Sequence, residues 1–325
     1  MKKIASKAML TISMIAIAMS TAYADQSKWP KSFIVGTDSQ GGTYFSYGSG
    51  WSKMVSKELS ISGAAEVTDG PTKNLALVHT GKLAFGMTTM GSARDALEGK
   101  SPLAPGLKMN NVCALFPMYG TPFLMSTFAS TGIKSISDIP KGAKIGFGPA
   151  GSTSDIYFSL ILEALGVQFE RQNGSWADLS RQLQNGLIDV LAFADSLPVP
   201  TISQLEAQSG INIIELTEAE QKKIIDVFPV SAFLIKANTY KSLKKDVRSI
   251  AMWNYTIAGC NVDADFVYRA VKIALDNNPK LVAMHQSAET SVKENWDKNT
   301  FIPFHPGAVR YYEEKKIKIP ANLKK

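Results

Sequence analysis

Short β-rich runs alternate with amphipathic helical stretches along most of this chain. The run Phe33–Gly36 leads through a polar, glycine-rich segment into a helical pattern over Tyr44–Leu59. A second unit places a strand over Ala65–Thr68 and a helix that begins at Pro71 and is closed by Gly81. Proline suits the first turn of a helix, and glycine suits the position just beyond the last turn. This alternation predicts an α/β fold in which helices cover both faces of a parallel sheet.

Two further units repeat the pattern in the middle of the chain. We expect strands over Lys144–Gly148 and Asp189–Phe193, and helices over Ile156–Leu165 and Leu179–Asn185. Ser152 is a suitable cap for the first of these helices, and Gly166 and Gly186 are suitable stops.

Two long apolar stretches, Val112–Phe128 and Val227–Ile235, contain prolines and are the predicted crossings between two lobes. About 300 mature residues are enough to bury two cores, which favours two lobes over one. We therefore expect a discontinuous lobe I, built from residues 25–120 and 235–325, and a lobe II built from residues 121–234. A ligand is expected in the cleft between them.

The first residues have the pattern of a secretory signal peptide. Lys2, Lys3 and Lys7 precede an apolar run over Ala8–Met19, and the segment ends near Ala22-Tyr23-Ala24. The run has roughly a dozen residues, fewer than the roughly 20 that cross a bilayer. No cysteine stands at the end of the run to carry a lipid anchor. We predict that residues 1–24 are removed and that the mature protein is periplasmic.

Charge and cysteine content narrow the possible partners. The chain has 35 basic and 28 acidic residues, and loss of the three leader lysines leaves a mild net charge of about +4. This excess is scattered, so we expect no nucleic-acid partner. Cys113 and Cys260 lie in apolar stretches, which favours buried thiols over a disulfide, although the sequence leaves their pairing open.

Catalytic templates do not fit this chain. Gly99-Lys100-Ser101 is similar to the end of a phosphate-binding loop, but Arg94 stands where that loop needs its first glycine. The segment Gly36–Gly42 lacks the dinucleotide-binding spacing, and no Gly-x-Ser-x-Gly elbow occurs. The three histidines, His79, His285 and His305, have no zinc-type spacing. We therefore expect a protein that is not an enzyme and has no cofactor or metal.

A strand that leads through a small polar loop into a helix recurs three times. The loops are Gly41-Gly42-Thr43, Asp69–Asn74 and Gly151-Ser152-Thr153-Ser154. The first turn of a helix has backbone N–H groups without partners and a partial positive charge, so it suits an anion. Each loop alone is more often a simple capped turn. Three together favour a small anionic ligand held beyond the carboxyl ends of the strands.

Several segments together resemble the TAXI receptors, the TRAP-associated extracytoplasmic immunogenic proteins. The opening Gly36-Thr37-Asp38-Ser39-Gln40-Gly41-Gly42-Thr43-Tyr44-Phe45 is similar to the signature of that family. Asn185-Gly186-Leu187-Ile188-Asp189 and the segment Ile302–Tyr312 agree as well. The resemblance implies a periplasmic-binding-protein fold with hinge strands between two lobes. It also implies a receptor role beside the integral membrane subunits of an ATP-independent TRAP transporter, with a small carboxylate such as glutamate or 2-oxoglutarate as ligand.

The resemblance also suggests where the ligand binds. It implies contacts at Thr43 and Tyr44, next to Gly42, and at Asn74, Ser152, Thr153 and Ser154. Two further segments follow predicted strands, the loop Met90-Gly91-Ser92 and the turn Asp195-Ser196, and they are expected to line the same cleft. Arg94 is the nearest candidate cation for a second carboxylate, although a solvated helix arginine is the simpler interpretation. Asp38 and Thr153 replace usual glycines of the family, and Thr153 should narrow the anion site.

Other functions remain open at this point. The same fold serves receptors of ATP-driven transporters and periplasmic sensor subunits, and a periplasmic enzyme is the remaining rival. We expect a monomer that closes around its ligand.

Overall fold

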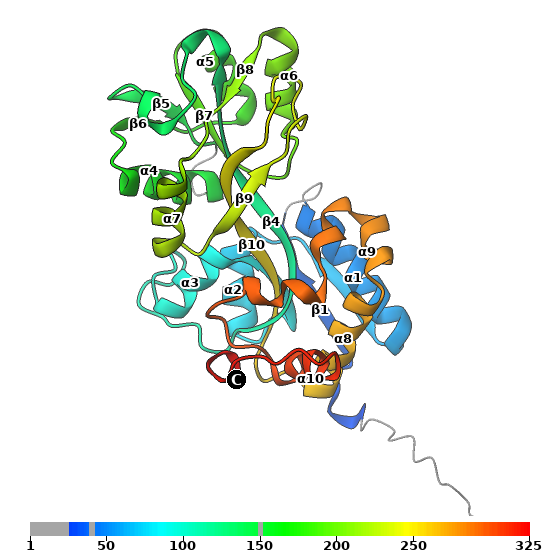
Figure 1. Ribbon diagram of the computed structural model, residues 1–325. Coiled ribbons are helices and arrows are strands. Elements are labelled where there is room, and N and C mark those ends of the chain that lie inside the picture. The colour runs from blue at the N-terminus through cyan, green and yellow to red at the C-terminus, as the bar shows by residue number, and fades with distance from the viewer. Residues whose placement is uncertain (1–25, 39–42, 149–151) are drawn as a thin grey trace, which may run out of the picture.

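The computed structural model describes residues 26–38, 43–148 and 152–325. Two lobes are joined by long strands that run from one lobe into the other (Figure 1). These strands are β4 (Cys113–Phe128) and β10 (Val247–Ala258), and they pair with each other antiparallel. The predicted leader, residues 1–24, and Gly42 lie outside the described residues, so both predictions stay untested. Within the described residues, no helix is both long and apolar enough to cross a membrane.

Lobe I is built on the sheet order β2-β1-β3-β10-β4. The strands β1 (Ser32–Gly36), β2 (Ser62–Glu66) and β3 (Phe85–Thr89) are parallel to one another. Helices α2 (Pro71–His79) and α3 (Met90–Glu98) lie to one side of this sheet, and α1 (Thr43–Leu59), α8 (Ala264–Asp276) and α9 (Asn278–Met284) lie to the other (Figure 1). The α10 helix (Pro306–Glu314) completes the lobe. Trp51 of α1 is fully buried against Phe85 and Phe116, with ring centroids 5.0 and 5.2 Å away.

Lobe II continues the same sheet through β4. Its strands are β7 (Val190–Ala194), β5 (Ala143–Gly146), β6 (Phe169–Gln172) and β8 (Ile211–Ile213). Its helices are the π-helix η4 (Ser154–Phe158), α4 (Ser159–Leu165), α5 (Trp176–Gln184), α6 (Pro200–Gln208) and α7 (Glu218–Val227). The mixed α/β fold and the strand–helix alternation predicted from the pattern are confirmed.

Proline and glycine residues mark the ends of several helices. Pro71 stands in the first turn of α2, and Gly81 has a φ of 73° just beyond the helix, a conformation that L side chains rarely adopt. Gly166 has a φ of 83° and ends α4.

The second strand ends at Glu66 rather than Thr68, and the predicted helix Ile156–Leu165 starts earlier, as the π-helix η4.

The segment Met90-Gly91-Ser92 was expected to be a loop, and this is wrong. These residues form the first turn of α3, because the hydroxyl of Thr89 caps the helix by accepting the Ser92 N–H at 3.3 Å.

The hinge region differs in part from the predicted crossings. The stretch Val112–Phe128 does form the long strand β4. The second predicted stretch contains β9 (Ser231–Ile235), but β9 pairs with the lobe II half of β10, over Val247–Ala251. Between these strands, Tyr240 and Leu243 pack in the core of lobe II. We therefore propose that the return to lobe I lies within β10 rather than at residue 235.

Cys113 and Cys260 form a disulfide, with their Cα atoms 5.1 Å apart. The preference for buried free thiols was wrong. Cys113 opposes Ala258 in the β4–β10 ladder, so the pairing of two strands far apart in sequence brings the sulfurs together. The disulfide joins the lobe I ends of β4 and β10, which we call the hinge strands.

Candidate ligand-binding cleft

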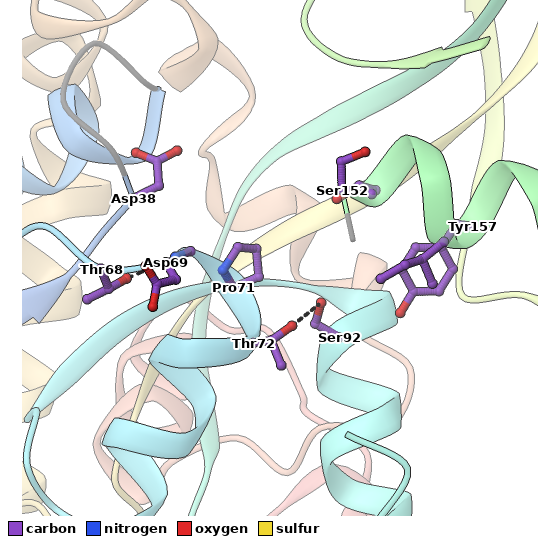
Figure 2. Close-up of a pocket in the computed structure, with 11 residues that line it drawn as sticks. Asp38, Thr68, Asp69, Pro71, Thr72, Ser92, Ser152 and Tyr157 are labelled. Atoms are coloured by element: carbon purple, nitrogen blue, oxygen red, sulfur yellow. Dashed lines mark hydrogen bonds between the residues drawn. The ribbon is translucent and has the colours of Figure 1, made fainter. Parts of the chain in front are cut away.

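A cavity of about 380 Å³ lies between the lobes, and we call it the polar cavity (Figure 2). Lobe I contributes the residues that follow β1 and β2 and the first turns of α2 and α3, and lobe II contributes the start of η4. The lining residues are Asp38, Thr68, Asp69, Gly70, Pro71, Thr72, Ser92, Ser152, Thr153, Ile156 and Tyr157. The carboxyl ends of parallel strands meet here, as the sequence predicted.

Hydroxyl groups and the start of α2 make the cavity wall polar. The Thr72 hydroxyl lies 3.4 Å from the Ser92 oxygen, across the gap between α2 and α3. Among the described residues, no side chain caps α2, whose N-cap residue is Gly70. The Gly70 N–H donates to the Thr68 hydroxyl at 3.1 Å, and Pro71 has no N–H. The first-turn N–H groups suited to an anion are therefore those of Thr72 and Lys73.

Two carboxylates also line the polar cavity, and they change its electrostatic character. Asp38 Oδ1 accepts the backbone N–H of Phe45 at 3.0 Å, in the first turn of α1. Burial raises the pKa of Asp38, and hydrogen bonds from backbone N–H groups, including that of Phe45, oppose the increase. Asp69 lies exposed at the rim. Among the described residues that line this cavity, none is a lysine or an arginine.

The three predicted residues at the start of the third helix have different positions. Ser152 and Thr153 line the polar cavity, and the Ser152 oxygen accepts the Asp155 N–H at 3.2 Å. Ser154 is buried, and its oxygen accepts the Ala194 N–H at 2.7 Å, which joins η4 to β7.

Asn74 is fully buried, and its amide is occupied inside lobe I. Its Nδ2 donates to the carbonyls of Thr37 and Met87 at 2.8 and 2.9 Å, and its Oδ1 accepts the Thr68 hydroxyl at 2.7 Å. It therefore supports the cavity wall from behind, through Thr68.

Tyr44, on α1, contacts the hinge strands. Its ring is 4% exposed, and its hydroxyl donates to Asn254 Oδ1 at 2.7 Å. The Asn254 amide donates to the Tyr119 carbonyl at 2.8 Å and to the Thr121 hydroxyl at 2.9 Å. Asn254 stands at an irregularity of the β10–β4 ladder, so this polar network fixes the hinge strands at a break in their pairing. Thr43 is not among the described residues that line the polar cavity.

A second cavity of about 680 Å³ lies along the hinge strands, and we call it the hinge cavity. It includes the predicted residue Ser196, together with Tyr119, Trp253 and Phe233. Asp195 is exposed next to Ser196. The sequence did not single out the hinge cavity, because Trp253 and Phe233 resemble ordinary core residues in an apolar strand.

The remaining candidates serve the fold or the contact between lobes. Met90 is buried, and Gly91 packs against the ring of Tyr157. Arg94 donates to the Val227 carbonyl at 2.7 Å and does not line the polar cavity. In the described part of the chain, no group of three or more His, Cys, Asp or Glu side chains could hold a metal.

Two lobes, long connecting strands and a polar cavity walled by both lobes define a two-lobed solute-binding fold. The chain belongs to the NMT1-like family, a family of periplasmic solute-binding proteins whose model matches residues 35–315. A TctC solute-binding protein from Polaromonas superposes with a TM-score of 0.53 at 13% identity, over 80% of this chain and 86% of the other, which supports the fold.

Weaker structural similarities extend to two other periplasmic binding proteins. The aliphatic sulphonate binding protein SsuA from Escherichia coli has a TM-score of 0.46 at 12% identity, over 90% of this chain and 96% of its own. BugD has a TM-score of 0.49 at 12% identity, over 89% and 95%.

Proposed function

We propose that this protein is the periplasmic receptor of a TRAP-type transporter and captures a small carboxylate by closing its lobes. The polar cavity carries the proposal, because its walls come from both lobes and a bound solute would contact both. A ligand that contacts both lobes favours the closed arrangement through that difference in contact.

Between the two predicted ligands, glutamate fits the polar cavity better than 2-oxoglutarate. The start of α2 and the hydroxyls of Ser152 and Thr153 can hold a carboxylate, because the first turn of a helix has free N–H donors and a partial positive charge. Asp38 and Asp69 would repel a ligand that carries only negative charge, and they would attract an ammonium group. We therefore propose a ligand with an amino group and at least one carboxylate.

The type of transporter rests on the resemblance to TAXI receptors. The Cys113–Cys260 disulfide supports export, because disulfides persist mainly in oxidising compartments. A receptor of an ATP-driven transporter and a sensor subunit are the alternatives. Genes for two membrane subunits without an ATPase beside the receptor gene would favour the TRAP assignment, and an adjacent ATPase gene would contradict it.

Thermal unfolding of ligand-stripped mature protein tests the ligand. The protein is unfolded and refolded with its disulfide intact, and then scanned with glutamate, 2-oxoglutarate and glutarate. A ligand that binds only the folded state raises the melting temperature. Glutamate should raise it most, and no shift with any carboxylate would refute the ligand class.

Calorimetry on Thr72→Val with Ser152→Ala then tests the place of binding. The double variant should weaken binding by about 1–3 kcal/mol, because two hydroxyl partners of the ligand are lost. Ser137→Ala, an exposed hydroxyl of lobe II outside both cavities, is the matched control. Unchanged affinity in the double variant would show that the ligand does not bind in the polar cavity, and the hinge cavity would become the candidate site.

A further inference from the structure

One face of α3 touches lobe II at the edge of the polar cavity. The hydroxyl of Tyr157, on η4, donates to Asp95 Oδ2 at 2.8 Å. Figure 2 shows Tyr157 on its helix above the start of α3, where Ser92 lies. This hydrogen bond joins the two lobes directly.

Gly91 makes room for the same contact. A Cβ atom built on Gly91 would overlap the ring and hydroxyl of Tyr157. The close approach of α3 to η4 depends on the missing side chain.

Arg94 makes a second contact between the lobes. Its Nη1 donates to the carbonyl of Val227, at 2.7 Å. Val227 is the last residue of α7, where carbonyls have no partner within the helix and favour a positive charge. The guanidinium is also 5.6 Å from the centre of the Phe301 ring, which belongs to lobe I.

The spacing of these residues places all three contacts on one side of the helix. Gly91, Arg94 and Asp95 are separated by three and four positions, and residues at that spacing share a helix face. Asp95 and Arg94 do not line the polar cavity. Asp95 is half-buried, and this burial raises the pKa of its carboxyl group.

We infer that this α3 face is a latch that holds the lobes together before the ligand arrives. Tyr157, Asp95, Gly91 and Arg94 are then positioning residues that set the closed fraction of the empty receptor. Because apparent affinity scales with the fraction that is competent to bind, loss of the latch weakens binding without removing a ligand contact. The effect on affinity rests on the proposed function.

Distances between labels on the two lobes test the latch without any ligand. Spin labels on cysteines introduced at Lys53 and Leu187, both exposed, report the separation of lobe I and lobe II while the native disulfide stays oxidised. Asp95→Ala and Gly91→Ala should each lengthen the mean distance and broaden its distribution. Glu98→Ala is the matched control, because Glu98 is on the same helix but pairs with Lys100 inside lobe I.

Calorimetry with glutamate gives the second measurement. Asp95→Ala should weaken binding about two- to tenfold, in line with the loss of one hydrogen bond, and Glu98→Ala should not. Unchanged label distances in both latch variants would overturn the latch. If no carboxylate binds the wild-type protein, the proposed ligand fails, and the label distances still decide the latch.

Discussion

The Asp38 carboxylate accepts a hydrogen bond from the backbone N–H of Phe45, with 3.0 Å between oxygen and nitrogen. The first turn of α1 is therefore partly neutralised by an anion of the protein itself. An external carboxylate gains less at a helix start that already holds a negative charge. We accordingly propose that the ligand carboxylate binds at the starts of α2 and η4, and that the amino group binds on the side of the cavity near Asp38.

Asp38→Asn should reverse the preference between the two acids. Asparagine can still accept the Phe45 N–H, so the start of α1 is kept while the charge is lost. Affinity for glutamate should fall and affinity for 2-oxoglutarate should rise, each by about 1 kcal/mol for a partly screened charge pair. Calorimetry with both ligands measures the ratio, with the exposed Asp297→Asn as control. An unchanged ratio would remove Asp38 from ligand selection.

Asn74→Ala should damage the fold more than the binding step. The change removes the buried amide donor of the Met87 carbonyl and one of the two donors of the Thr37 carbonyl, which keeps the Thr68 hydroxyl. We expect a loss of about 3 kcal/mol in the free energy of unfolding, measured in urea. Affinity in the folded fraction should change little. Normal stability combined with lost affinity would instead support the original prediction that Asn74 contacts the ligand.

Removal of the disulfide should lower stability substantially. The bond spans 147 positions of sequence, and the chain-entropy relation gives about 5 kcal/mol for a loop of that length. The double variant Cys113→Ala with Cys260→Ala should therefore unfold at a lower temperature than the oxidised wild type. A reducing agent should lower the melting temperature of the wild type and leave the double variant unaffected. Equal stability of all forms would contradict the pairing.

His305 should make stability depend on pH in the weakly acidic range. Its ring is buried, with Nδ1 accepting the Gly307 N–H and Nε2 bonded to the Val262 carbonyl. Burial lowers the pKa of His305 to about 4, so between pH 6.5 and 4 the unfolded chain binds a proton that the folded protein does not. The contribution of His305 is fully present above pH 6.5. As the pH falls to about 4, roughly 3 kcal/mol of stability is lost.

Urea unfolding at several pH values measures this effect. His305→Asn keeps a side chain that can cap α10 and has no titrating group. Its stability should fall less steeply between pH 6.5 and 4 than that of the wild type. Identical slopes for the two proteins would show that His305 does not cause the dependence.

The sequence alone determined the features that depend on neighbouring residues. Alternating apolar and helical periods identified the α/β class, and Pro71, Gly81 and Gly166 located helix ends, because their backbone preferences act within a few residues. The apolar length of β4 marked it as a crossing strand for the same reason. Ser152 and Thr153 could be placed just before a helix because the start of a helix after a strand is a local pattern.

Only the tertiary structure decided which distant groups meet. Cys113 meets Cys260 because β4 pairs with β10, and that register depends on the packing of the whole sheet. Asn74 and Ser154 have the chemistry of ligand contacts, but other parts of the chain supply their partners. A polar side chain binds whichever group the fold brings within about 3 Å, and sequence neighbours do not specify that group.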